Sequence, residues 1–391
     1  MFLNTKKGKS RHDKLLLMRI MFTGGGSGGH FYPLIAIAEA IRDRQTQQGN
    51  TVEMFYIGPE AFSQSDLEKF DIHFIKCPAG KRRNYFSILN YTDKFKVITG
   101  FFVAFVKLLW LYPDVVMSKG SYTSVPVILA AWMLRIPIVI HESDAVPGRA
   151  NMLAGRFAKY IGIAHDDVAS HFKTEKVALV GMPMRKIFFT KIPNPFELIG
   201  IPNDKPVILV TGGSLGAKRI NDLIIQALDK LLPNFTILHQ AGNEKAEKVK
   251  EYATSLVKDK DLLANYFVLG HMPQAQMSAA MQAASIVISR AGSTTLFELA
   301  LLGKPAIVIP IPEDVSRDQR ANAYAYARGG GATVLEEKNL SDDILVAEIT
   351  RIMTVENVYQ EMSQAAKSFT VGTAAYTLAD TLLSIGIEHE S

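Results

Sequence analysis

Residues 290–298 read RAGSTTLFE, a stretch that predicts a glycine turn followed by the start of a helix. The run just before it, SIVIS at 285–289, is short and β-branched, as is typical of a buried strand in a parallel sheet. After a glycine turn, Leu296, Leu299 and Leu302 have the spacing of an apolar helix face. A helix that begins directly after a strand points its free N–H groups and the positive end of its dipole into a crevice where phosphates bind.

Glu298 lies one turn inside this predicted helix, and two interpretations of it remain open. Its carboxylate could accept hydrogen bonds from the vicinal hydroxyls of a sugar. Alternatively, Thr295 and Glu298 form a capping box, which stabilises a helix start without any ligand. Taken alone, the stretch favours the capping box, but the other motifs of the chain favour a ligand site.

The composition is that of an ordinary globular protein. At 391 residues the chain is long enough for two α/β domains, and it is 48% hydrophobic and 21% charged. The single cysteine, Cys77, excludes an internal disulfide framework and a cysteine-based metal cluster, and it fits a reducing cytosol. The net charge of +5 is mild and gathers beside apolar residues, which argues against a nucleic-acid partner. The longest apolar run, 97–112, is interrupted by Lys107 and is too short to span a bilayer.

Strands and helices alternate along the chain, which predicts parallel sheets with helices on both faces. Residues 1–18 are predicted to be a basic flexible lead-in, and residues 19–186 a first α/β domain. Residues 187–204 are rich in proline and have no clear period, so they are predicted to be an interdomain linker. The pattern begins again over residues 205–369. The predicted architecture is therefore two Rossmann-like domains that face each other across a cleft.

Two glycine-rich loops each follow a predicted strand and precede a predicted helix. The first, GGGSGGH at 24–30, contains GxGxxG, but the second strand lacks the acidic residue that would bind an NAD ribose. This loop ends in His30, which is either a general-base candidate or a histidine that only caps the helix. The second loop, TGGSLGA at 211–217, can bring backbone N–H groups and Ser214 against a phosphate, but it lacks the GK[ST] of an ATPase P-loop.

Charged residues also follow two later strands. Glu142, in HESD at 141–144, comes directly after the predicted strand 138–140, and the carboxyl ends of parallel strands are where doubly wound folds bind ligands. A solvated loop is the alternative for this segment. Arg185 ends GMPMR at 181–185 beside the expected cleft, where it could bind a diphosphate; the alternative is an ordinary surface arginine.

Together these motifs resemble the MurG family, whose members add N-acetylglucosamine from UDP-N-acetylglucosamine to lipid I in peptidoglycan synthesis. The resemblance extends from about residue 19 to the last helices. In the first half the matching pieces are GGGSGGHFYP at 24–33, SYTS at 121–124, HES at 141–143, PGRANM at 147–152 and GMPMR at 181–185. In the second half they are GGSLGA at 212–217, SRAGSTTLFELALLGKPAIVIP at 289–310 and DQRANA at 318–323. Each piece is weak alone, but their order and spacing are specific.

The resemblance implies the α/β fold called GT-B, in which two Rossmann-like domains bind the donor nucleotide on the C-terminal side and the lipid acceptor on the N-terminal side. It also implies that the last helix, at about 370–388, returns to complete the first domain. Carried over position by position, it implies that the ribose meets Glu298 and that uridine meets the backbone near Met272. The other donor-binding positions that it implies are Ser27, Gly28, Gly29, Asp144, Arg185, Ser214, Ser293, Thr294, Thr295, Leu296, Phe297, Gln319 and Asn322.

An inverting transfer needs a base that deprotonates the acceptor hydroxyl and an electrostatic sink for the departing diphosphate. His30 or Glu142 is the predicted base, and His30 is preferred because an unperturbed imidazole titrates near neutral pH. Helix N-termini together with Arg185 and Ser214 are the predicted sink. We therefore expect neither a metal nor a cofactor, with UDP-N-acetylglucosamine as a substrate.

A polyprenyl-linked acceptor implies docking on a membrane. Basic residues next to apolar and aromatic side chains suit an anionic bilayer surface, and the segment after residue 80 has this pattern. A peripheral position on the cytoplasmic face of the cell membrane is therefore expected. The membrane and acceptor candidates are Lys81, Arg82, Arg83, Phe86, Leu89 and Tyr122.

Some positions depart from the pattern of the MurG family. Ser143 and Asp144 stand where the family usually has glutamine and asparagine, Met182 where it favours asparagine, and Leu215 where it favours glutamine. The family often has a second glycine at Ser121. These departures motivate an alternative, a GT-B transferase that uses a UDP-sugar on another lipid. A non-catalytic nucleotide-sugar-binding scaffold is the alternative outside the enzymes.

Overall fold

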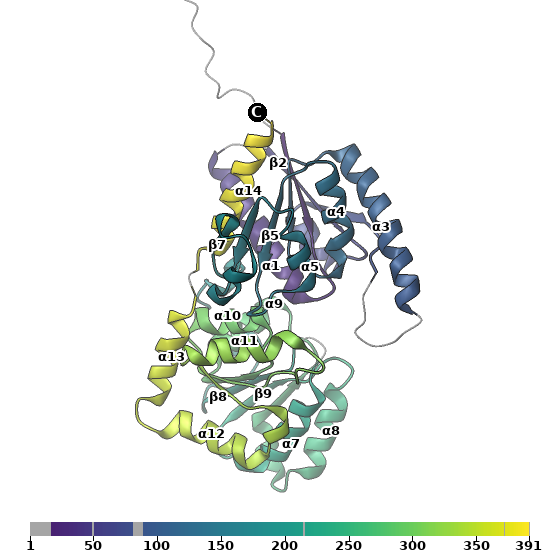
Figure 1. Ribbon diagram of the computed structural model, residues 1–391. Helices are drawn as coiled ribbons and strands as arrows, with labels where there is room; N and C mark the ends of the chain where they lie inside the picture. Colours follow the sequence, from purple (N-terminus) through teal and green to yellow (C-terminus); the bar gives the residue numbers. More distant parts are fainter. Residues whose placement is uncertain (1–16, 49–50, 81–88, 214–215, 371, 391) are drawn as a thin grey trace, which may run out of the picture.

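The computed structural model describes residues 17–48, 51–80, 89–213, 216–370 and 372–390. Two parallel β-sheets form separate halves of the molecule, each with helices on both faces (Figure 1). Helices α9 (Gln274–Ala283) and α10 (Ser293–Leu302) lie on the side of the second half that faces the first (Figure 1). The predicted α/β class with two Rossmann-like sheets is confirmed.

The first sheet has the strand order β3-β2-β1-β4-β5-β6-β7, and all neighbouring strands are parallel. The order reverses between β1 and β4, and the loops that leave these strands diverge to open a crevice at their carboxyl ends. The strands are β1 (Leu17–Thr23), β2 (Thr51–Gly58), β3 (Ile72–Lys76), β4 (Val115–Ser118), β5 (Ile138–Glu142), β6 (Tyr160–Ile163) and β7 (Val177–Leu179).

Helices bury both faces of this sheet, which explains why its central strands are continuously apolar. Helices α1 (Gly28–Gln48) and α14 (Ala374–Glu390) pack on one face. On α14, Leu378, Leu382 and Ile385 have helical spacing and point into this core, while Asp380 forms an ion pair with Arg44 of α1 at 2.7 Å. The opposite face carries α3 (Leu89–Leu111), α4 (Val125–Met133) and α5 (Arg149–Ala154). A short helix, α2 (Gln64–Lys69), precedes β3.

The second sheet repeats the plan with the order β10-β9-β8-β11-β12-β13, again all parallel. Its reversal lies between β8 and β11, so the loops after these strands form a second crevice. The strands are β8 (Val207–Thr211), β9 (Thr236–Gln240), β10 (Tyr266–Leu269), β11 (Ile286–Ser289), β12 (Ala306–Val308) and β13 (Ala332–Val334).

Two groups of helices cover the second sheet. Helices α7 (Lys218–Leu231), α8 (Ala246–Leu256) and α12 (Asp342–Thr354) pack on the face away from the first domain. Helices α9, α10 and α11 (Arg317–Arg328) pack on the other face, and α13 (Val358–Ser368) contributes to both clusters. The chain then crosses back to the first sheet as α14, which packs against α1 and contacts β1 and β4 (Figure 1).

The segment predicted to be an interdomain linker, residues 187–204, lies between β7 and β8 and is partly helical. It begins within a 3-10 turn at Lys186–Phe188 and contains α6 (Pro195–Ile199). Asn194 caps α6 by accepting a hydrogen bond from the Glu197 N–H at 3.4 Å, and Pro195 occupies the first helical position. Helix α6 packs against α9, and Pro195 therefore marks a helix start.

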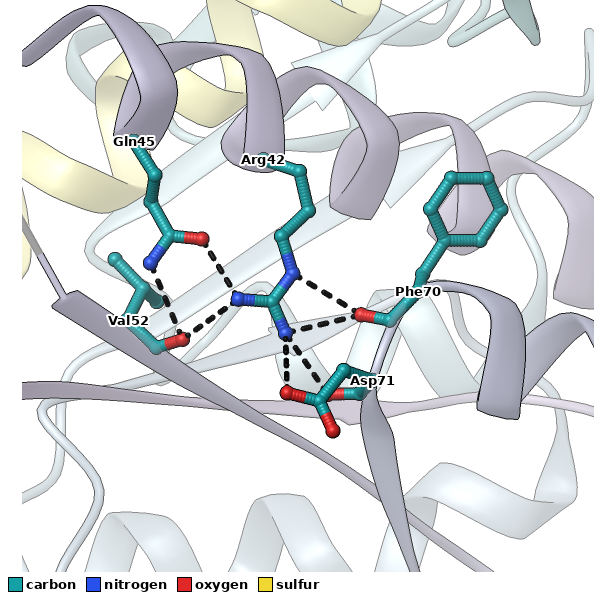
Figure 2. Close-up of polar contacts among 5 residues, drawn as sticks. All are labelled: Arg42, Gln45, Val52, Phe70 and Asp71. Carbon is teal, nitrogen blue, oxygen red and sulfur yellow. Dashed lines mark hydrogen bonds and ion pairs between the residues drawn. The ribbon is translucent and has the colours of Figure 1, made fainter.

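Arg42 on α1 ties together the turns at one edge of the first sheet (Figure 2). Its guanidinium donates to the carbonyl oxygens of Val52 and Phe70 at 3.0–3.2 Å, to the Asp71 carbonyl at 3.0 Å and to the Asp71 carboxylate at 3.2 Å. Gln45 accepts a further bond at 2.8 Å. Asp71 has a φ of +52°, a conformation that is strained for a residue with a side chain, and Arg42 holds it there.

Replacing Arg42 with methionine is expected to lower the free energy of unfolding by about 2 kcal/mol, because bonds from a charged donor to several carbonyl oxygens are lost. Urea denaturation of the variant and the parent measures this difference. The matched control is Arg351→Met, which removes two largely exposed bonds to Glu348, at 2.9 and 2.6 Å, and should cost about 1 kcal/mol or less. Equal losses in the two variants would contradict the role given to Arg42.

Candidate functional site

A cleft of about 500 Å³ separates the two domains, and loops from both crevices line it. The loops after β1 and β5 supply one wall, and those after β8 and β11 supply the other. Most of the predicted site residues meet here. The predicted residues that line the cleft are Ser27, Gly28, Gly29, His30, Asp144, Arg185, Met272, Ser293, Thr294, Thr295, Glu298, Gln319 and Asn322.

The start of α10 faces the start of α1 across this cleft. Gly292 is the N-cap of α10 and no side chain caps it, so the alternative capping box between Thr295 and Glu298 is not formed. The Thr294 hydroxyl is buried without a hydrogen-bond partner, and a Cβ placed on Gly29 would lie 3.7 Å from it. Two positive helix ends therefore converge where a diphosphate could bind.

Arg185 and Glu298 form a buried pair in this cleft. The Arg185 Nη2 lies 3.4 Å from the Glu298 Oε1, and the guanidinium stacks 4.1 Å from the ring centre of Tyr32. The Arg185 Nη1 is buried and has no hydrogen-bond partner. Burial raises the pKa of Glu298 to about 7, although Arg185 opposes this shift. The site thus holds an arginine with an unused donor beside a carboxyl that titrates near neutrality.

His30 lies on the first turn of α1 and faces the cleft. Its Nδ1 is 2.9 Å from the Ser27 Oγ. Burial lowers the pKa of His30 to about 4, the nearby Lys119 ammonium lowers it further, and Glu142 partly opposes both. The imidazole is therefore neutral at physiological pH, with a ring nitrogen able to accept a proton.

Glu142 is held differently from His30. It is the last residue of β5, not the first of the loop, and it is 3% exposed. Its Oε1 accepts from the backbone N–H groups of Ser143 at 2.8 Å and Asp144 at 3.1 Å, and its Oε2 accepts from the Gly148 N–H at 2.9 Å and the Asn151 amide at 3.0 Å. This carboxylate orders the loop and does not line the cleft.

The second domain supplies a pocket at the carboxyl ends of β8 and β9. The backbone near Met272 is predicted to meet the uridine of the donor, and the Met272 N–H donates to the Gln240 Oε1 at 2.9 Å. Gln240 also donates to the Thr211 hydroxyl at 3.3 Å. Gly216 is required here, since a Cβ on it would lie 1.8 Å from the Ala241 oxygen. Ser214 lies outside the described residues.

Some predicted residues are not in the cleft. Leu296 and Phe297 are each 1% exposed and pack in the core between α10 and the second sheet, because they occupy the helix face opposite Glu298. Their side chains therefore do not line the cleft, and their assignment to donor binding stays a prediction. Tyr122 is half-buried and lies against the first glycine loop, where a Cβ on Gly26 would meet its ring at 3.5 Å.

The membrane candidates Lys81, Arg82, Arg83 and Phe86 lie outside the described residues, and Leu89 is described only as the start of α3. The described part of α3 instead presents an apolar stripe to solvent. Its most exposed members are Trp110 at 81%, Phe95 at 70% and Phe102 at 62%, with Ile98, Val106 and Leu109 between them. The inner face of α3, with Ala104 and Leu108, is core.

Three cleft-side residues were missed at the level of sequence. Gln240 and Lys119 both stand at carboxyl ends of strands, the same signal that identified Glu142. Lys119, directly after β4, is 1% exposed. Ser143 is 6% exposed and lines the cleft. Its Oγ accepts a hydrogen bond from the Lys119 Nζ, and its carbonyl oxygen accepts one from the Ser293 hydroxyl.

Among the described residues, no group of three or more His, Cys, Asp or Glu side chains is placed to hold a metal ion. The sequence contains one Asp-x-Asp, Asp259-Lys260-Asp261. Both carboxylates are exposed at the surface of the second domain, where the Asp259 side chain accepts from the Asp261 N–H at 3.1 Å. In the part of the chain that the structure describes, no helix is both long and apolar enough to cross a membrane.

Comparisons with known proteins agree with this two-domain arrangement. The glycosyltransferase family 28 N-terminal domain matches residues 20–163, and the glycosyltransferase family 28 C-terminal domain matches residues 207–378. The first match covers the loops after β1 and β5, and the second covers those after β8 and β11.

Relatives extend over almost the whole chain. One relative is UDP-N-acetylglucosamine--N-acetylmuramyl-(pentapeptide) pyrophosphoryl-undecaprenol N-acetylglucosamine transferase 2 of Bacillus thuringiensis subsp. konkukian. The two chains are 35% identical over 347 residues, and the match covers 88% of this chain and 94% of the relative. This chain is 33% identical over 384 residues to the transferase of the same description from Treponema denticola, with 93% and 97% covered. The crystal structure of Acinetobacter baumannii MurG matches with a TM-score of 0.70 at 27% identity, over 94% of this chain and 99% of that one. The chain therefore belongs to the MurG family, within glycosyltransferase family 28.

Proposed function

We propose that the protein transfers N-acetylglucosamine from UDP-N-acetylglucosamine to lipid I, the undecaprenyl-diphosphate-linked N-acetylmuramyl-peptide, and so forms lipid II for peptidoglycan synthesis. The observation that carries this proposal is the convergence of two helix N-termini with the unused Nη1 of Arg185 beside the buried Glu298. This arrangement suits a diphosphate flanked by a ribose. The names of the relatives supply the sugar and the acceptor.

The transfer inverts the configuration at the sugar. The acceptor hydroxyl attacks C1 from the face opposite UDP, so that a new C1–O bond forms as the bond from C1 to the diphosphate oxygen breaks. The hydroxyl proton passes to His30, which is neutral because its pKa is lowered to about 4. Glu142 is the weaker candidate for the base, since its four hydrogen bonds already occupy both oxygens.

UDP departs as an anion and needs stabilisation in the cleft. The starts of α1 and α10 supply backbone N–H groups and dipoles, and Arg185 supplies a full charge. Ser214 is proposed to add a hydroxyl from the second glycine loop. These groups provide the sink without a divalent metal, and the donor itself is the only small molecule that the proposal requires.

The test incubates the purified protein with labelled UDP-N-acetylglucosamine and a short-chain lipid I in the presence of EDTA. Transfer of label to the lipid, with β stereochemistry at the new linkage, is the expected result. The proposal that lipid I is the acceptor would be overturned if the donor bound and the label moved to another lipid in an acceptor screen but not to lipid I. Transfer that depends on added magnesium would overturn the proposal that no metal is needed.

We further propose that the protein docks peripherally on the cytoplasmic face of the cell membrane through the exposed stripe of α3. Lys96 and Lys107 lie on the same helix, so apolar and basic side chains are combined on its outer face. This pattern suits an anionic bilayer surface. The helix stands at the outer edge of the first domain (Figure 1), and Lys81, Arg82, Arg83 and Phe86 precede it in the chain.

Replacing Phe102 and Trp110 with serine is expected to weaken binding to phosphatidylglycerol vesicles by roughly 100-fold or more, because burying each aromatic side chain contributes about 1.5–3 kcal/mol. Co-sedimentation with vesicles measures the binding. The matched control replaces Tyr252 and Leu256, which are 61% and 57% exposed on α8 of the other domain. If the control loses as much vesicle binding as the α3 variant, the docking surface is wrongly assigned.

Affinity for UDP-N-acetylglucosamine is expected to fall as the pH drops below about 7. The pKa of Glu298 is raised to about 7, so the carboxylate that accepts ribose hydroxyls is progressively protonated below that pH. His30 stays neutral over this range because its pKa is about 4. Calorimetric titration from pH 5 to 8 measures the affinity, and this donor is suitable because its diphosphate, esterified at both ends, does not titrate there. Glu298→Gln should remove the pH dependence; a variant that keeps it would contradict the assignment.

A further inference from the structure

Lys119 is a buried cation at the switch point of the first sheet. It follows β4 directly, it is 1% exposed, and its backbone N–H donates to the Thr23 carbonyl of β1 at 3.0 Å. A Cβ on Gly24 would lie 3.0 Å from the Lys119 Cβ, so the first glycine loop covers it closely. A lysine is rarely buried to this degree without a charge partner.

The partners of Lys119 lie on the loop after β5. Its Nζ donates to the Ser143 Oγ at 2.7 Å. Burial lowers the pKa of Lys119, and the carboxylates of Glu142 and Asp144 oppose this shift. Glu142 already accepts four hydrogen bonds from its own loop, so its charge is well solvated. Asp144 has the smaller effect on the Lys119 pKa, but its own loop solvates it less: its carboxylate accepts a hydrogen bond from the Asn322 amide of the other domain at 2.9 Å.

The same loop forms the direct contact between the domains on the donor side. The Ser293 hydroxyl at the start of α10 donates to the Ser143 carbonyl at 2.5 Å. On α11, the Asn322 amide accepts from the Ala145 N–H at 2.7 Å and donates to the Asp144 Oδ1 at 2.9 Å. Ser293 and Asn322 both line the cleft, so the position of this loop affects the position of two proposed donor-binding side chains.

We propose that Lys119 is a positioning residue: its buried ammonium binds Ser143 and balances the charge of Asp144, and it thereby holds the 143–145 loop against α10 and α11 in the arrangement that binds the donor. The part of this inference that concerns the donor rests on the proposed function. Without Lys119, Asp144 and Glu142 would leave uncompensated negative charge beside a cleft built for a diphosphate, and the loop would lose its anchor beneath the sheet.

The test is a cycle of four proteins: the parent, Lys119→Met, Asp144→Asn and the double variant. Hydrogen exchange of the Ala145 amide in the ligand-free protein reports loop position, because this N–H is protected only while it donates to Asn322. Lys119→Met is expected to speed its exchange about tenfold or more, and adding Asp144→Asn is expected to restore most of the protection, since the unbalanced charge is then removed. The affinity for UDP-N-acetylglucosamine should fall in Lys119→Met and recover in the double variant, and KM should change more than kcat.

Lys304→Met is the control for losing a partly buried lysine elsewhere in the protein. The Lys304 Nζ donates to the carbonyls of Gln282 at 2.8 Å and Ala284 at 2.7 Å, away from the cleft. This variant should lower the melting temperature while leaving exchange of the Ala145 amide unchanged. The inference is overturned if Lys119→Met leaves that exchange unchanged, or if the double variant exchanges as fast as Lys119→Met. If the exchange behaves as expected but the parent does not bind the donor, the positioning role stands and the proposed function fails.

Discussion

Replacing His30 with alanine is expected to lower kcat by about 10²- to 10⁴-fold, the usual contribution of a positioned general base. The affinity for UDP-N-acetylglucosamine should change little, because His30 acts on the acceptor hydroxyl. Its low pKa of about 4 makes it a weak base but keeps it unprotonated, and the Lys119 charge that lowers this pKa also disfavours the imidazolium. Single-turnover assays with saturating donor separate the loss in chemistry from any loss in binding.

The matched variant is Glu142→Gln, which keeps the shape of the side chain and part of its hydrogen bonding. We expect a smaller loss of kcat together with a lower melting temperature, since the carboxylate orders the backbone of the loop at Ser143, Asp144 and Gly148. A large loss of kcat in Glu142→Gln with full activity in His30→Ala would assign the base to Glu142. Near-full turnover in both variants would exclude both residues.

Replacing Arg185 with methionine is expected to lower kcat/KM for the donor by about 10²- to 10³-fold, which is the range for removing one preorganised donor from a developing anion. The Arg185 Nη1 has no protein partner, so the ligand is its natural acceptor. The substitution also leaves Glu298 buried without its cation, which should raise the pKa of Glu298 beyond about 7.

Steady-state kinetics at varied donor concentration measure the change in kcat/KM caused by Arg185→Met, and Arg42→Met serves as the control. Arg42 donates to backbone oxygens far from the cleft, so its loss should lower stability without changing KM for the donor. A change of less than about threefold in kcat/KM for Arg185→Met would mean that the arginine only pairs with Glu298 and stacks on Tyr32.

The parts of the site that could be predicted from sequence are those encoded by adjacent residues. The strand, glycine turn and helix around Ser293 depend on local patterns, and so does the loop that ends in His30. The strand-end position of Lys119 can be seen in the sequence, but its partner cannot, because Lys119 meets Ser143 across two neighbouring strands. Helical spacing alone separates the residues of α10 into two groups. Thr294, Thr295 and Glu298 share one helix face, and Leu296 and Phe297 lie on the other.

The alternative of a capping box at Thr295 and Glu298 rested on a local sequence signal that a tertiary contact overrides. Glu298 is drawn to Arg185 of the other domain and not to the helix start. Within the predicted linker, Pro195 begins α6, which packs against α9. A departure from the family pattern is explained by geometry: Ser121 has a φ of +69°, a conformation that glycine adopts without strain.

The return of α14 to the first domain means that the chain passes between the domains twice, once before α6 and once between α13 and α14. Both passages are fastened to the same carboxylate on α1, since the Lys186 Nζ forms an ion pair with Asp43 and the Tyr376 hydroxyl donates to Asp43 at 2.6 Å. The two segments that join the domains therefore share one anchor on the first domain, and a change at Asp43 would release both of them together.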